Sequence, residues 1–412
     1  MDLVQQKQQN DGKGNAFSKY RTFVSRGLAL SIVLCLMLLL PGNACAGSFR
    51  LTPVFQQVLP MGDGAVAVLY TDGTVRVAGN NRISRVAANW REICQLYYQN
   101  RSPFGDGPML AGLTENGSVV TTEGDLPEWK NVEKLRFCYR GIVGITKNGS
   151  VMICGEWDDP SILTSLTNVE DLVYSSIQDM WGCLKKDGRV YYVGDYLDSS
   201  QVQWTNVKEL RDSGHSFYVI KNDRTVEGRL FDTYSGLRDA VKVVDYYDFI
   251  FGISANGKLL THNGGNIYTN LGSMMVDKPG SPYYAGEVSI SRFTQVKDIV
   301  PLRGLILLNK DGTVQAIGET EWNLREWNRI NKVCGYYDSS TQTAMLYGIR
   351  KDGTVIANEF RSSSSHQTVN NQYRGWKLKD MYVGWGGVIG LTTDGKLVGD
   401  GAYKNVDFSI FN

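Results

Sequence analysis

A short pattern of apolar and turn-forming residues recurs nine times along the chain. Each copy has an apolar residue, two further residues, an Asp-Gly or Asn-Gly pair in all but one case, one residue, and then Val or Leu. The copies span residues 69–75, 113–119, 145–151, 184–190, 220–226, 253–259, 308–314, 349–355 and 391–397. Gly, and less readily Asn or Asp, accepts a positive φ, so this pattern predicts nine β-hairpins.

The spacing inside the pattern also predicts the hairpin register. A three-residue loop, with a type I turn closed by a left-handed Gly, pairs Leu69 with Val75 and Leu184 with Val190 on one face of each hairpin. The fifth copy has Arg224 in place of the Gly. We expect that hairpin to use Asn222 or Asp223 as its left-handed residue and to be the least regular of the nine.

A further strand-like phrase precedes most hairpins, as in NVEKL from Asn131, NVEDL from Asn168 and NVKEL from Asn206. Each unit is therefore predicted to hold at least three short strands, too few to be stable alone. The turn aspartates Asp72 and Asp394 bracket eight intervals of about 40 residues each, a period typical of repeat arrays. The tail at 404–408 repeats the strand phrase without a hairpin, and we expect it to complete the blade at the other end.

Alternating apolar positions, abundant Gly and no long segment of helical period after the leader favour an all-β fold. A β-propeller of about nine short three- to four-stranded blades explains the period, because radial stacking leaves only short, protected edges. Seven or eight blades remain the alternative, since the unit with Arg224 or a terminal unit can fail to form a blade of its own. A β-helix would need shorter and more uniform coils.

The phrases GLxxDGTVxxxG and NVxxL resemble the repeats of the regulator of chromosome condensation family. The resemblance runs from Phe55 to the end and is greatest to the short bacterial secreted form, which includes the propeller-type β-lactamase inhibitory proteins. It implies a propeller that binds other proteins, because secreted members do so, whereas nuclear members act as nucleotide exchange factors or chromatin binders. This chain departs from the family in carrying mostly tyrosines where members commonly have a Gly-rich, His-containing phrase.

The first 46 residues read as a signal peptide. A basic leader precedes an apolar run at 27–40, and Ala44-Cys45-Ala46 matches a small-x-small cleavage site. The run is about 14 residues, short of the roughly 20 that span a bilayer. We expect cleavage near Ala46, release of 47–412 as a single extracellular propeller domain, and no membrane span in the mature chain; retention of the leader as an anchor is the alternative.

Composition excludes several functional classes. The chain has 43 basic and 42 acidic residues and no basic run, which disfavours nucleic-acid binding. Removal of the leader leaves five cysteines at strand positions without zinc-ligand spacing, so we expect buried thiols, no disulfide framework and no metal. The three histidines, at 215, 262 and 366, share no register, so a His-based catalytic site is not predicted. Glycoside hydrolysis needs two carboxylates on either side of the scissile bond, and acidic pairs such as Asp158 with Asp159 are the only candidates for them in the sequence.

The candidate site is aromatic. Between the strand phrase and the hairpin, successive units carry Tyr or Trp with nearby charged residues, and ring closure would bring these loops to one face. Such a surface has the composition of a protein-binding hot spot. The candidate partner-binding residues are Tyr98, Tyr139, Arg140, Tyr174, Tyr247, Asp248, Arg303, Tyr337, Asp338 and Trp385.

Adjacent tyrosines on a strand point to opposite sides, so about half of these rings should be core. Tyr98, Tyr247 and Tyr337, the second of each pair, are predicted to be exposed. The sequence therefore predicts a secreted, non-catalytic protein-binding propeller without a cofactor. The alternative is a carbohydrate-binding or carbohydrate-active propeller at the cell surface, which would use the same aromatic residues. A nucleotide exchange role would rest on analogy of fold alone.

Overall fold

The computed structural model describes residues 54–411, with breaks at 103, 105–106, 124–125, 127–128, 195–201, 213–216, 229–236, 247–248, 262–266, 271–283, 319–321, 362–363 and 371–372. The chain divides into two units, Met1–Leu51 and Thr52–Asn412, and every described residue belongs to the second. The predicted signal peptide, 1–46, lies outside the described residues.

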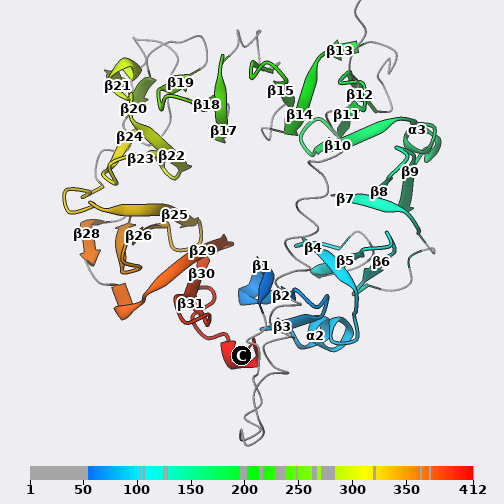
Figure 1. The fold of residues 1–412 in the computed structure, drawn as a ribbon, viewed down its shortest axis with the longest axis horizontal. Coiled ribbons are helices and arrows are strands. Elements are labelled where there is room, and N and C mark those ends of the chain that lie inside the picture. Colours follow the sequence, from blue (N-terminus) through cyan, green and yellow to red (C-terminus); the bar gives the residue numbers. More distant parts are fainter. Residues whose placement is uncertain are drawn as a thin grey trace, which may run out of the picture. The chain divides into compact units, whose positions relative to one another are not determined.

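The second unit is built from nine antiparallel sheets of three or four strands, which we number blades 1 to 9 in chain order. Strands pair in sequence order within every blade, and Figure 1 shows the first strand of each blade toward the middle of the arrangement. The all-β propeller with nine blades is therefore confirmed. The repeat containing Arg224 forms a blade of its own, so the count does not fall to eight.

The strand bounds are as follows. Blades 1 to 3 contain β1 (Phe55–Pro60), β2 (Val66–Tyr70) and β3 (Val75–Ala78); β4 (Ile93–Gln99), β5 (Met109–Thr114) and β6 (Val119–Thr121); and β7 (Val132–Cys138), β8 (Gly141–Thr146) and β9 (Val151–Gly155). Blades 4 to 6 contain β10 (Val169–Ser175), β11 (Met180–Lys185), β12 (Val190–Val193) and β13 (Val202–Trp204); β14 (Val207–Asp212), β15 (Phe217–Lys221) and β16 (Val226–Gly228); and β17 (Ala240–Tyr246), β18 (Phe249–Ser254) and β19 (Leu259–Thr261).

Blades 7 to 9 contain β22 (Val296–Pro301), β23 (Gly304–Asn309) and β24 (Val314–Gly318); β25 (Ile330–Asp338), β26 (Thr343–Arg350), β27 (Val355–Arg361) and β28 (Ser364–Asn370); and β29 (Leu378–Gly384), β30 (Gly387–Thr392) and β31 (Leu397–Gly401). A two-stranded sheet, β20 (Ile267–Asn270) with β21 (Tyr284–Val288), lies between blades 6 and 7 in the sequence. Two short helices, α2 (Asn81–Ala87) and α3 (Ser161–Thr164), lie in the links after blades 1 and 3.

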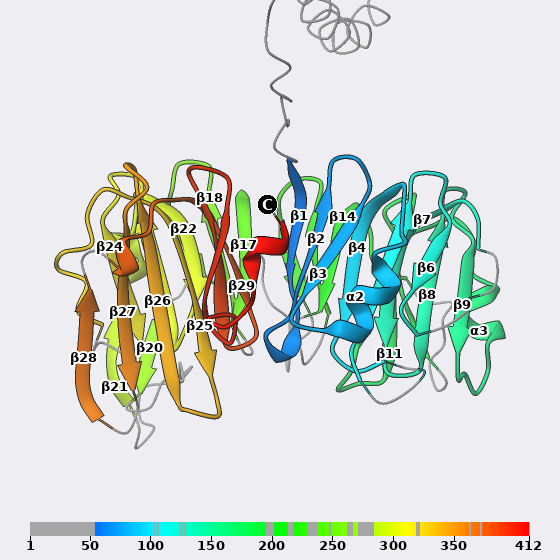
Figure 2. The same cartoon turned by 90° about the horizontal axis from the view of Figure 1, so that it is seen from below.

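The hairpins have the predicted register. Leu69 pairs with Val75 and Leu184 with Val190, and the turn glycines Gly73 and Gly188 have φ near +80°. Figure 2 shows the strands standing side by side, so that hairpins gather at one end of the blades and the loops between first and second strands at the other. The turn chemistry therefore determined both the pairing and the end at which each loop emerges.

The expectation for the fifth hairpin is wrong. Arg224 itself is the left-handed residue, with φ +66°. The hairpin keeps the pairing of Ile220 with Val226 and the same two turn hydrogen bonds as the others, from Lys221 N to Thr225 O and from Arg224 N to Lys221 O. The surrounding strands impose the turn geometry, so an unfavourable residue adopts the conformation instead of shifting it.

In blades 3, 4 and 5 the first strand begins one residue later than the sequence phrase indicated. Asn131, Asn168 and Asn206 have φ between +55° and +60° and lie just before the strand, a conformation that Asn tolerates better than most residues. A bulge follows at the same place in all nine blades, as between Val132 and Lys134. The bulge turns the next side chain of each first strand toward the neighbouring blade.

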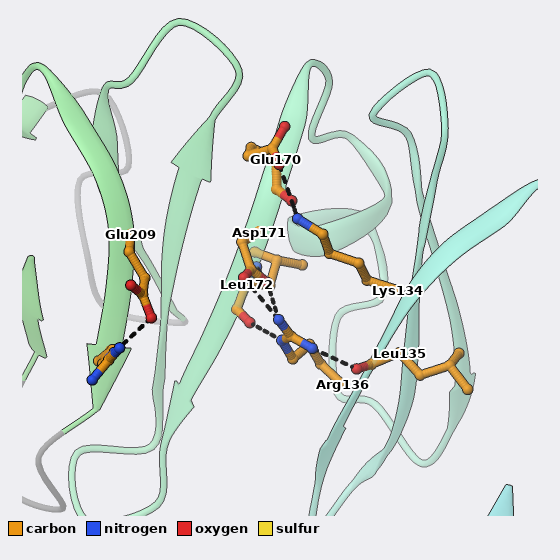
Figure 3. Close-up of polar contacts among 8 residues, drawn as sticks. Lys134, Leu135, Arg136, Glu170, Asp171, Leu172 and Glu209 are labelled. Atoms are coloured by element: carbon orange, nitrogen blue, oxygen red, sulfur yellow. Dashed lines mark hydrogen bonds and ion pairs between the residues drawn. The ribbon is translucent and has the colours of Figure 1, made fainter. Parts of the chain in front are cut away.

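The apolar core is divided among the junctions between blades. Nine buried clusters each combine residues of two consecutive blades, and the ninth joins blade 9 to blade 1 through residues such as Ile389 and Val68. Polar contacts add to this packing: Arg136 of β7 donates to the Leu172 carbonyl oxygen of β10 at 3.0 Å and pairs with Asp171 at 2.7 Å (Figure 3). Each blade is thus stabilised by its two neighbours.

The tail does not add a strand to blade 1, contrary to expectation. Residues Phe408–Phe411 form a short 3-10 helix, η5, and blades 1 and 9 each keep their own three strands. Phe411 is buried in the cluster shared by those blades, and its carbonyl oxygen accepts a hydrogen bond from the Tyr70 hydroxyl at 2.9 Å. Side-chain packing of the tail therefore closes the ring.

Candidate functional site

The loops between the first and second strands of the blades form the surface that we call the first-loop face. Its described residues lie at 61–65, 100–102, 104, 107–108, 139–140, 176–179, 302–303, 339–342 and 385–386, and the corresponding residues of blades 5 and 6 lie outside the described ranges. Eleven large apolar side chains remain exposed in the described residues, and six of them lie in or beside these loops: Phe104, Tyr139, Ile177, Tyr337, Val383 and Trp385. Apolar exposure is therefore concentrated at this end of the blades.

Blades 3 and 4 meet at this face in a polar and aromatic cluster, the Tyr139 cluster, formed by Tyr139, Arg140, Tyr174 and Asp179. The Asp179 carboxylate accepts hydrogen bonds from Tyr174 at 2.7 Å, from Tyr139 at 3.0 Å and from Arg140 at 2.9 Å. Arg140 also pairs with Asp158 and donates to the Tyr139 hydroxyl at 2.7 Å. Asp179 thus joins three of the predicted site residues from two blades.

The contacts within the Tyr139 cluster fix its charge state. Burial opposes ionisation of Asp179, but the hydrogen bonds from Tyr174, Arg140 and Tyr139 outweigh it and hold the pKa of the carboxyl below its ordinary value. Burial and the hydrogen bond to Asp179 raise the pKa of Tyr174. The contact with Asp158 contributes most to the raised pKa of Arg140. At neutral pH the cluster therefore presents a fixed guanidinium and carboxylates beside an exposed phenol ring.

Tyr139 is the exposed part of this cluster, with 56% of its surface accessible. Its ring packs against Tyr174 at 6.1 Å and beneath the Arg140 guanidinium at 5.2 Å, which limits its rotation. Below it, a cavity of about 40 Å³ is lined by Trp157, Trp181 and other residues of the two blades. That volume is far below the 300–1,000 Å³ typical of small-molecule pockets, so the cluster offers a contact surface.

A second group of predicted residues meets between blades 7 and 8. The Arg303 guanidinium lies 5.4 Å from the Tyr337 ring centre and 4.8 Å from that of Phe360. Tyr337 is 39% exposed and its hydroxyl donates to the Gln342 side chain at 2.6 Å. Asp338 accepts hydrogen bonds from the backbone and side chain of Ser340, so it stabilises the loop rather than pointing freely outward.

Trp385, in the loop of blade 9, is the most exposed large apolar side chain of the described residues, at 73%. Tyr98 is less exposed than predicted: it is partly buried against the core cluster between blades 1 and 2, and its hydroxyl accepts from Gly62 N at 2.8 Å and donates to Asn100 at 2.9 Å. Tyr247 and Asp248 lie outside the described residues.

Sequence reasoning missed Asp179 and Asp400. Asp400, which is buried, accepts hydrogen bonds from Tyr347 at 2.7 Å, from Arg374 at 2.8 Å and from Tyr373, and so connects blades 8 and 9. Neither aspartate belongs to a recurring phrase, so no repeat signal marked them. For Asp179, the sequence signal that could have identified it is its position in the loop, five residues after the strand residue Tyr174.

Other chemistry is limited. In the described part of the chain, no group of three or more His, Cys, Asp or Glu side chains is placed to hold a metal ion. The side chains of all three histidines lie outside the described residues. The five cysteines from 94 to 334 are all free. Among the described residues, no helix combines the length and apolar character needed to cross a membrane.

No protein-family model matches the chain, and no curated protein matches its sequence. Among solved structures, it is similar to PorZ, a surface component of the type-IX secretion system of Porphyromonas gingivalis, with 10% identity, a TM-score of 0.32 and coverage of 84% of this chain and 62% of that chain. It is similar to the CRINKLY WD40 ectodomain of the Arabidopsis thaliana receptor kinase ACR4, with 14% identity, a TM-score of 0.30 and coverage of 65% and 96%. A third similarity is to the extracellular domain of the one component system BT4673 of B. thetaiotaomicron, with 10% identity, a TM-score of 0.30 and coverage of 86% and 58%. This chain thus spans less than two thirds of the PorZ and BT4673 structures, and similarities of this degree say nothing about what it binds.

Proposed function

We propose that the chain is a secreted, non-catalytic propeller that binds another protein on its first-loop face. The observation that carries this proposal is the exposure of Trp385, Ile177 and Tyr139, at 73%, 61% and 56%, on one end of a ring of packed blades. Exposed apolar side chains concentrated in this way are typical of interaction surfaces. Secretion rests on the leader at 1–46 and is part of the proposal.

The arrangement suits protein recognition for an energetic reason. Tyr, Trp and Arg supply most of the binding energy in protein interfaces, and a partner gains more from side chains that are already ordered. Tyr139 and Arg140 are held by Asp179 and Asp158, and Tyr337 is held by Gln342 and Arg303. Little rotamer freedom would therefore be lost when a partner docks on these residues.

The test is capture of a partner from the culture medium of the source cells by the immobilised mature chain. The triple variant Y139A/Y337A/W385A should stay folded with only a small drop in the melting temperature, because these side chains are at least 39% exposed, and it should lose the captured protein. The variant V202A is the matched control: Val202 is 42% exposed but lies in β13 of blade 4, outside the first-loop face. Equal capture by all three proteins would contradict the proposal.

Two further measurements refine the result. The resemblance to β-lactamase inhibitory propellers makes a β-lactamase a specific partner to test, with inhibition expected from the wild-type chain and not from the triple variant. A glycan array covers the carbohydrate alternative. Binding to an oligosaccharide that is lost with W385A, without capture of any protein, would overturn protein binding as the function.

A further inference from the structure

A large cavity lies between blades 5 and 6, near the hairpin end and separate from the first-loop face. It has a volume of about 750 Å³ and is lined by β14, by residues 220–222 and 224 of the hairpin and by the start of β17. Five basic side chains contribute to its lining and one acidic side chain, Glu209, does so: the basic residues are Lys208, Arg211, Lys221, Arg224 and Lys242. The lining is therefore strongly positive, in a chain whose overall charge is close to zero.

The charge arises because the pattern of contacts between blades changes here. Between blades 3 and 4, Arg136 meets Asp171, the residue after the bulge of the next first strand (Figure 3). Between blades 5 and 6, the equivalent Arg211 still reaches across to a carbonyl oxygen, that of Val243, at 3.1 Å. The residue after the bulge is now Lys242, however, so a cation occupies the place of the acid.

The cations that have partners pair within their own blade or with blade 7. Arg211 pairs with Glu209 at 2.6 Å, Lys221 pairs with Glu227 at 2.6 Å, and Lys242 pairs with Asp298 of blade 7. Lys208 and Arg224 are both exposed and make no ion pair among the described residues. Two positive charges on different elements thus remain uncompensated at the cavity.

Arg224 also explains why the junction is open. Eight other hairpins have Gly at this position, and in the seven that another blade follows, the amide of the next first strand bonds to the Gly carbonyl oxygen at 2.7–3.1 Å. A Cβ at Gly117 or Gly149 would lie 2.6 or 2.7 Å from the backbone of that next strand. Arg224 carries a Cβ, and the corresponding bond from Ala240 N is the longest of the set, at 3.3 Å.

A left-handed Arg is more strained than Gly in the same conformation. Strained residues of this kind persist most often at functional sites.

We infer that the cavity between blades 5 and 6 binds a small oxyanion that carries at least two negative groups, with Arg224 and Lys208 as its main ligands. The planar guanidinium of Arg224 can donate two parallel hydrogen bonds to one phosphate or carboxylate group, and Lys208 supplies a charge for the second. The cavity has ample room for a ligand of this size.

The test is isothermal titration of pyrophosphate into the full mature chain, at low and at physiological ionic strength. Binding is expected, and it should weaken as salt is added. The variants R224G and K208Q should each weaken it about ten-fold or more, since each removes a charge-assisted contact. K379Q is the matched control, because Lys379 holds the same bulge position as Lys208 but in blade 9.

The variant R224G should fold at least as stably as the wild type, because Gly occupies this position in the other eight hairpins. Its melting temperature should be equal or higher, so a loss of binding cannot be attributed to unfolding. A folded R224G that binds pyrophosphate as tightly as the wild type overturns the inference, as does equal loss in K379Q or no binding at low salt. Citrate serves as a second ligand: equal affinity identifies a general oxyanion site, whereas selective binding of pyrophosphate identifies a phosphate site.

Discussion

The Tyr403 hydroxyl donates a hydrogen bond to the Met61 carbonyl oxygen at 2.8 Å, joining residues that are 342 positions apart in the chain. Both residues are fully buried, Tyr403 in the cluster shared by blades 9 and 1 and Met61 in the cluster shared by blades 1 and 2. Together with the contact from Tyr70 to Phe411, this bond connects the last blade to the first. Closure therefore depends on side chains that follow the last strand, and a change in them should act on the whole ring.

The variant Y403F should lower the free energy of unfolding by about 1–3 kcal/mol, because it leaves the buried Met61 carbonyl oxygen without this donor. The measurement is a urea denaturation curve followed by circular dichroism. Y191F is the control, since Tyr191 is only partly buried and its hydroxyl makes no hydrogen bond to any residue that the structure describes. A loss of stability that is equal in the two variants would show that the bond to Met61 does not close the ring.

Two turn glycines should respond differently to the same substitution. Gly117 and Gly395 both have positive φ, at +82° and +89°, so Ala at either position is strained by about 1 kcal/mol. At Gly117 the added Cβ would also lie 2.6 Å from Val132 N of the next blade, whereas at Gly395 nothing lies within 4 Å. G117A should therefore cost about 1–3 kcal/mol more than G395A. Equal costs in chemical denaturation would mean that blades do not meet at these turns.

The hairpins, the blade count and the register were predictable because each follows from chemistry within seven residues. Asp-Gly and Asn-Gly turns with flanking apolar residues determine the pairing of Leu69 with Val75 without reference to the rest of the chain. The radial arrangement followed from the period and from the need of a small sheet to bury both faces. Tyr337, Tyr139 and Trp385 lie in or beside the first loops, as expected from the common place of these loops in every repeat unit.

The remaining features depend on contacts between units, which local patterns do not encode. Arg224 adopts a left-handed φ because the neighbouring strands fix the turn, and Tyr98 is packed because blade 1 places Gly62 against it. The tail at 404–408 looks like a strand phrase, yet Phe411 and Tyr403 are drawn into the cluster between blades 9 and 1. Asp179 was missed because it is a partner of predicted residues and lies in a loop without a repeated sequence.

The Tyr139 cluster should contribute to stability in a pH-dependent way. The folded pKa of Asp179 is held below its ordinary value of 3.8, so its contribution is present above that pH and is lost as the pH falls through the folded value. Asp179 is about half exposed, so the effect should be less than about 1 kcal/mol. D179N should have a lower melting temperature than the wild type at pH 7, and the two should converge below pH 3.8. A constant difference across that range would show that the charge of Asp179 is not involved.

The free thiols should react slowly in the folded protein. Burial raises the pKa of Cys183 to about 11 and that of Cys334 to about 12, and it also raises the pKa of Cys94, Cys138 and Cys154. The thiolate is the reactive form, so little of it is present at pH 8.

Titration with a chromogenic disulfide should therefore give slow modification, beginning at the partly exposed Cys94 and Cys154 as located by peptide mass spectrometry. After denaturation, five thiols should react if the leader has been removed and seven if it has been retained. Rapid native reaction at Cys183 or Cys334 would contradict the packing between blades, because either sulfur can be reached only when two neighbouring blades separate.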